Sequence, residues 1–86
     1  MNYTIYMEST PNPEVMKFVA NKILTENSIE LLNNKNSDQV PLAMELFKFP
    51  FVKSIFISYN FISITKNNEI DWHEISTEVR EYINNY

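Results

Sequence analysis

The alternation of apolar and polar positions predicts a chain built mainly of short strands. Residues 3–8 alternate, with Tyr3, Ile5 and Met7 on one side of an extended chain. A period of two is typical of a half-buried strand. Later apolar runs predict further strands over residues 16–19, 28–32, 52–58 and 61–65.

The last two of these runs predict a hairpin. They are separated by Tyr59-Asn60, which fits a two-residue turn with Asn60 at the positive φ that glycine would otherwise occupy. Within the hairpin one side is purely aliphatic and should face the helices, namely Ile55, Ile57, Ile62 and Ile64. The other side carries hydroxyl residues together with Phe56 and Phe61.

Two segments instead have helical spacing. Pro41 suits a first helical turn, and this helix should end before Pro50. Its apolar face is formed by Leu42, Ala43, Leu46 and Phe47. Near the C-terminus, Asp71 followed by Glu74 predicts a capping box. The apolar stripe expected after it consists of Trp72, Ile75, Val79, Tyr82 and Tyr86, with Trp72 a core residue.

The connections complete the expected fold. Residues 9–13 place two prolines around Asn12, which predicts a rigid connector. Residues 33–39 are all polar and predict a surface loop. We therefore expect one domain over residues 1–86, of class α+β: a two-layer, mostly antiparallel sheet with both helices on one face, in the order β-β-(β)-α-β-β-α.

The amino-acid composition excludes several kinds of metal, cluster and nucleotide site. The 86 residues include no cysteine, so a disulfide or a thiolate-bound metal or cluster is excluded within this sequence. They include no glycine either, which excludes the Gly-rich phosphate loops. No catalytic arrangement or cofactor site can be assembled, and we expect no enzyme activity.

The net charge and the hydropathy of the chain limit the classes of partner that we expect. The net charge of −4 opposes binding to nucleic acid or to anionic lipid. No apolar run approaches the roughly 18 residues of a membrane span, and the first residues have no signal-peptide pattern. We expect a cytoplasmic protein that acts on other proteins.

Two surfaces deserve weighing as sites. Phe56 and Phe61 form a candidate docking patch if the second sheet face is open. Two alternatives compete with that view, because residues 20–40 could fold over this face or the alternation could invert at one strand end. Five of the eleven acidic residues lie in or just before the last helix, together with the single His73. A polar, solvated helix face explains the acidic residues better than an electrostatic handle for a basic partner, and explains His73 better than a metal ligand or a general base.

Several short motifs, in this order, resemble a known family. They are Thr10-Pro11-Asn12-Pro13, Lys17-Phe18, Pro41-Leu42-Ala43, Leu46-Phe47, Val52, Phe56, Phe61-Ile62, Thr65-Lys66 and Trp72. The sequence is similar over almost its whole length to the N-terminal domain of the Nfu (NifU-like) iron–sulfur cluster scaffold and carrier proteins. The most specific part is Thr10, Pro11, Asn12 and Pro13 followed by Lys17 and Phe18.

The resemblance implies a function as well as a fold. In such proteins a separate domain with a CxxC motif holds the cluster, and the N-terminal domain is thought to guide partner recognition. It implies as partners iron–sulfur assembly proteins or apo-client proteins, including a CxxC-bearing Nfu domain in the same or another chain. On this basis the sequence is either a piece of a longer protein or a stand-alone version of the domain.

Alternatives and departures remain. Asp71, Glu74, Glu78 and His73 could form a weak site for iron or another divalent cation, although at most three helix positions converge. A purely structural or oligomerising role is the third possibility. Val40 replaces the helix-capping Ser usual in the family, and Phe51 replaces a Gly, which leaves the geometry of these loops open.

Overall fold

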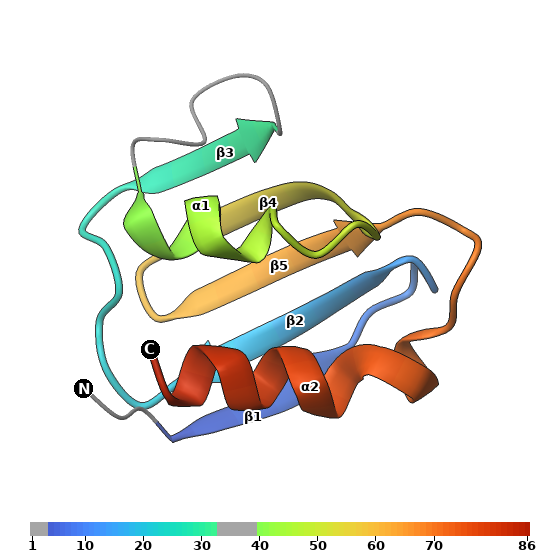
Figure 1. Cartoon of the computed structure of the whole chain (residues 1–86). Helices are drawn as coiled ribbons and strands as arrows, with labels where there is room; N and C mark the ends of the chain where they lie inside the picture. The colour runs from blue at the N-terminus through green and yellow to red at the C-terminus, as the bar shows by residue number, and fades with distance from the viewer. Residues whose placement is uncertain (1–3, 33–39) are drawn as a thin grey trace.

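The computed structural model describes residues 4–32 and 40–86, and in these ranges it contains one five-stranded antiparallel sheet and two helices. The strands are β1 (Ile5–Ser9), β2 (Val15–Ala20), β3 (Ser28–Leu32), β4 (Val52–Ser58) and β5 (Phe61–Lys66). The helices are α1 (Pro41–Leu46) and α2 (Trp72–Asn84). In space the strands follow the order β1-β2-β5-β4-β3, and both helices lie on the same face of the sheet (Figure 1). The predicted α+β class is confirmed.

The core lies between the helices and one face of the sheet. The four isoleucines predicted to face the helices, Ile55, Ile57, Ile62 and Ile64, are each at most 1% exposed. They are directly paired across β4 and β5, Ile55 with Ile64 and Ile57 with Ile62. Facing side chains of such pairs pack against each other, so the central hairpin forms the floor of the core.

The apolar side of α2 is rotated from the prediction. Its buried residues are Trp72, Ile75, Val79 and Ile83, whereas Tyr82 is only half-buried and Tyr86 is exposed. Helix α2 ends at Asn84, so Tyr86 lies beyond the last turn, and Ile83 completes the spacing of three and four. Assigning Tyr86 to the stripe was therefore wrong.

The helix starts also differ in detail from the prediction. Asp71 is the N-cap of α2 with extended φ and ψ, but its side chain makes no capping hydrogen bond, so the predicted capping box is absent. The N–H of Glu74 bonds instead to the backbone oxygen of Asp71. Helix α1 has Pro41 in its first turn, as predicted, and its N-cap Val40 offers no side-chain acceptor.

The hairpin turn uses a different residue at positive φ. Tyr59 has φ 51°, and Asn60 does not share this geometry. Asn60 is held in place by Ala20, whose N–H donates to the backbone oxygen of Asn60 at 2.7 Å and whose own backbone oxygen accepts from Asn60 Nδ2 at 3.2 Å. These two bonds extend the β2 pairing to Asn60 and leave the left-handed conformation to its neighbour.

Two predictions remain, one for the polar segment 33–39 and one for membrane-spanning helices. The polar segment 33–39, predicted as a surface loop, lies outside the described residues, as does Tyr3. In the part of the chain that the structure describes, neither helix is long and apolar enough to cross a membrane.

Candidate interaction surfaces

The sheet face away from the helices carries the predicted aromatic patch. Phe56 is 37% exposed and Phe61 is half-buried, and their ring centroids lie 6.0 Å apart. Segment 20–32 does not fold over them, because it continues into β3, which extends the sheet beside β4. Within the described residues this face is open.

The alternation of β4 does invert, but only at its start. The pairing with β5 shifts between Val52 and Ser54, so that Val52 is buried and Lys53 is exposed. A bulge of this kind changes which face each side chain takes. Because it lies before Ser54, it leaves Phe56 and Phe61 on the open face.

Strand pairing shows what surrounds the two phenylalanines, because directly paired residues share a face. Phe61 pairs with Val19, and Val19 pairs with Tyr6. Val19 is buried but does not belong to the core under the helices, and Tyr6 is exposed. The open face thus has its own apolar strip, which runs from β1 to β4.

A cation lies over this strip. The Lys17 ammonium is 4.2 Å from the centroid of the Phe61 ring and 3.9 Å from a carboxylate oxygen of Glu8. Lys17 shares its row on the sheet with Ser63 and Phe56. The Lys17 position of the family motif therefore belongs to the same surface as the predicted docking patch, which sequence reasoning had not connected.

The Thr10-Pro11-Asn12-Pro13 motif forms a turn closed by its own polar groups. The Thr10 hydroxyl bonds to the backbone oxygens of Asn12 and Val15 at 2.9 and 3.1 Å and accepts from the Asn12 N–H. The Asn12 side-chain oxygen accepts from the N–H of Glu14 at 3.0 Å. Such local bonds fix a turn without help from the rest of the fold.

The residue after this turn, Glu14, binds the core tryptophan Trp72. The backbone oxygen of Glu14 accepts both the Trp72 indole N–H and the N–H of Lys66, each at 3.0 Å. Trp72 is 6% exposed, and its ring meets that of Phe18 edge to face at 5.7 Å. Glu14, which directly follows the motif turn, and the buried Phe18 of β2 therefore join β2, β5 and α2. A structural role accounts for them.

Between the helices lies an aromatic cluster. Phe49 stacks on Phe51 with centroids 5.3 Å apart and meets Tyr82 edge to face at 5.6 Å. Phe51, where the resembling family usually has Gly, also approaches Trp72 at 6.3 Å. The phenylalanine at this position thus fills space in the cluster.

A polar bridge ties the two helices above this cluster. The Tyr82 hydroxyl donates to Glu45 at 2.9 Å, and Lys48 donates to the same carboxylate at 3.1 Å. Both bonds hold the pKa of Glu45 below its ordinary value, with that from Lys48 the larger cause. The bond to Glu45 raises the pKa of Tyr82.

The acidic helix face does not converge on a ligand. His73, Glu74 and Glu78 are exposed. Among residues 4–32 and 40–86, no three His, Asp or Glu side chains gather closely enough to hold a metal ion. No observation on these residues favours the alternative of a divalent-cation site.

The fold defines a class of protein: a small two-layer domain made of one antiparallel sheet and two helices. Residues 5–86 match the family model described as "Scaffold protein Nfu/NifU N terminal". The chain belongs to this family.

Curated relatives of the chain are also named as NFU1 or NifU-like proteins. The chain is 34% identical over 77 residues to the human protein named NFU1 iron-sulfur cluster scaffold homolog, mitochondrial, and 32% identical over 78 residues to NifU-like protein C1709.19c of Schizosaccharomyces pombe. Each match covers 87% of this chain and 30% of the relative, so the chain spans under a third of their length.

The structural likeness extends over nearly the whole fold. The solution structure of a NifU-like protein from Saccharomyces cerevisiae superposes with a TM-score of 0.80 at 25% identity, over 98% of this chain and 77% of that one. The crystal structure of protein SAV1430 from Staphylococcus aureus gives 0.74 at 25% identity, over 95% of this chain and 98% of that one.

Proposed function

We propose that residues 1–86 form one non-catalytic interaction domain of an iron–sulfur cluster scaffold or carrier protein. The domain would bring iron–sulfur assembly proteins or apo-clients to a CxxC domain that holds the cluster. Membership of the Nfu N-terminal family supports this role. So does the absence of cysteine, because a cluster carried by thiolates needs a second chain or domain to hold it.

The observation that carries the proposal is the Phe56–Phe61 pair on the open sheet face. Aromatic side chains that are already ordered contribute strongly to binding, because little conformational freedom is lost when a partner covers them. Phe61 is held by the Lys17 cation–π contact and by its neighbour Phe56. This surface therefore has the ordered aromatic anchor that protein interfaces use.

The test is a backbone NMR titration of the 86-residue protein with a CxxC-bearing Nfu domain and with candidate apo-client proteins. We expect resonances of β4 and β5 around Phe56 and Phe61 to shift, and the Phe56→Ser variant to weaken binding at least about tenfold. Met44→Ser is the matched control, because Met44 is similarly exposed but lies on α1 at the opposite layer.

Two results would count against this function. Equal losses in the two variants would show that the open face is not the docking surface. No response to any partner would remove the interaction role itself. Cell fractionation is a separate check on the predicted cytoplasmic location, since the human relative is named as mitochondrial.

A further inference from the structure

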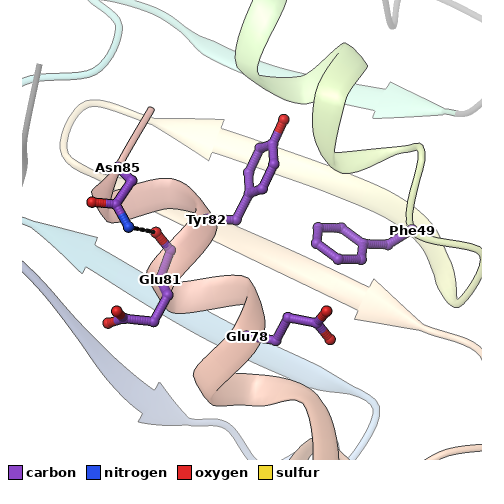
Figure 2. Close-up of a pocket in the computed structure, with 5 residues that line it drawn as sticks. All are labelled: Phe49, Glu78, Glu81, Tyr82 and Asn85. Atoms are coloured by element: carbon purple, nitrogen blue, oxygen red, sulfur yellow. Dashed lines mark hydrogen bonds between the residues drawn. The ribbon is translucent and has the colours of Figure 1, made fainter.

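A second surface, separate from the open sheet face, lies beside α2 on the helical layer. It is a groove of about 520 Å³ lined by Phe49, Glu78, Glu81, Tyr82 and Asn85 (Figure 2). A smaller hollow of about 180 Å³ adjoins it and shares Phe49 and Tyr82, with Glu45 and Lys48 as its other walls. The volume of the larger groove is sufficient for one long side chain with part of its backbone.

The floor of the groove is aromatic and ordered. The rings of Phe49 and Tyr82 meet at 82°, and the Tyr82 hydroxyl is tied to Glu45 of α1. Phe49 is supported from behind by Phe51. The faces and edges of these rings are therefore fixed before any ligand arrives, and a cation placed against them would be attracted by the negative ring faces.

The two charged residues that line the larger groove, Glu78 and Glu81, are both acidic. Figure 2 shows the Glu78 side chain extending from α2 on the side where Phe49 lies, and the Glu81 carboxylate extending on the other side of the helix. Glu81 pairs with Arg80 at 3.2 Å, and Lys48, the cation of the adjoining hollow, pairs with Glu45 at 3.0 Å. Glu78 has no such partner among the described residues.

We infer that this groove binds an arginine side chain presented by a segment of a partner protein. A guanidinium can lie flat against an aromatic ring while its N–H groups donate to a carboxylate, which a lysine ammonium cannot do in the same way. Phe49 and Tyr82 supply the rings, and Glu78 supplies the carboxylate. The inference does not depend on the open sheet face and extends the protein's binding capacity to basic partners.

The test is an NMR titration of the 86-residue protein at low salt with an arginine-containing tripeptide blocked at both ends. The same peptide with citrulline, which keeps the shape of arginine but is neutral, is the comparison. We expect shifts at Phe49, Glu78 and Tyr82 with the arginine peptide, and at least about fivefold weaker binding of the citrulline peptide. Equal binding of the two peptides would overturn the inference.

Variants separate a local contact from overall charge. Glu78→Gln should weaken the arginine peptide about fivefold, whereas Glu74→Gln, which removes the same charge from an exposed position of the same helix, should not. Phe49→Leu should also weaken binding while keeping an apolar side chain. Equal effects of Glu78→Gln and Glu74→Gln would show only nonspecific attraction, and the inference would fail.

Two further measurements define the ligand and the independence of the site. Butylguanidine carries the guanidinium without a peptide backbone or a second charge, and if it bound as tightly as the peptide, the assignment to a protein segment would be wrong. Phe56→Ser should leave binding of the arginine peptide unchanged. That variant therefore distinguishes failure of the groove from failure of the proposed docking at the sheet face.

Discussion

The two faces of the sheet are built from alternate residues of the same strands, yet they have opposite properties. On the helical side, Ile55 and Ile57 are 1% exposed; on the other side, the intervening Phe56 is 37% exposed. Because each face receives every second residue, a strand can be constrained by packing on one side and remain free to change on the other. The face that stabilises the fold and the face that we propose for recognition are thus built from alternate residues of the same strands.

The difference shows where the binding surfaces could arise. The covered face uses aliphatic residues in close contact, where a change of even one methylene is felt. The open face uses an aromatic strip held by Lys17 and the strand pairing. The groove near α2 is a third case, in which Tyr82 of α2 and Phe49 of the segment after α1 line a hollow on the helical layer.

The largest expected effect is at Trp72, where the covered face is joined to the Thr10–Val15 turn. Trp72→Ala should cost about 3–5 kcal/mol, because a buried indole is lost and its cavity is left unfilled. Urea unfolding followed by circular dichroism measures the loss. Trp72→Phe keeps a ring but removes the bond to Glu14, and should cost clearly less. Equal losses would mean that ring packing contributes little.

Substitutions at two neighbouring residues, Ile57 and Phe56, should show the largest difference in stability between the two faces. Ile57→Ala should lower the free energy of unfolding by about 2–5 kcal/mol, since this β4 residue is buried in the core under the helices. Phe56→Ala should cost about 1 kcal/mol, because part of the ring is already in water. If thermal unfolding gave the two variants equal stability, the separation of the faces would be wrong.

Much of this arrangement could be predicted, because burial on one side imposes a period of two on the sequence. The hairpin isoleucines and the helix residues Leu42, Ala43 and Leu46 were assigned to the core correctly. The face occupied by Phe56 and Phe61 followed from the same alternation. These features depend on local spacing, which a single sequence records.

What was missed depends on contacts between distant segments. The turn residue at positive φ is Tyr59, because Ala20 captures Asn60, 40 positions away. The backbone oxygen of Glu14, just after the Thr10–Pro13 turn, receives a bond from the Trp72 indole 58 positions away, and no side-chain pattern records that bond. The groove at Phe49 requires the positions of two helices; the Phe49-Pro50-Phe51 run between them was its one sequence signal.

The next effect tests the Thr10 turn that supports the covered face. Thr10→Val keeps the shape of the side chain but removes a hydroxyl that serves Asn12 and Val15. We expect a loss of about 1–2 kcal/mol, measured by urea unfolding, because neutral hydrogen bonds contribute about 1 kcal/mol each. Thr77→Val on the exposed side of α2 is the control and should change stability little.

In the turn of the hairpin we expect a substitution that increases stability. Tyr59 has φ 51°, a region that disfavours residues with a Cβ atom and is better tolerated by asparagine. Tyr59→Asn should therefore raise the unfolding free energy by about 0.5–1 kcal/mol. The corresponding change at Tyr6, an exposed tyrosine within β1, should bring no gain. A thermal melt that gave no gain for Tyr59→Asn would show that the turn carries no such strain.

The smallest expected effect is a pH dependence at the edge of the groove. Bonds from Lys48 and Tyr82 lower the pKa of Glu45, so their stabilisation is complete above the ordinary carboxyl value of 4.5 and is lost as the pH falls below it. The raised pKa of Tyr82 has the opposite sign, so the contribution of its protonated hydroxyl is present below pH 10.0 and is lost as the pH rises above it.

Tyr82→Phe separates this pair from the other titrating groups. The variant retains the ring against Phe49 but removes the bond to Glu45. Its unfolding free energy should depend less on pH than that of the parent protein at both ends of the range. Identical pH profiles would show that the bridge between the helices contributes nothing measurable, and that the aromatic contacts alone hold the groove in shape.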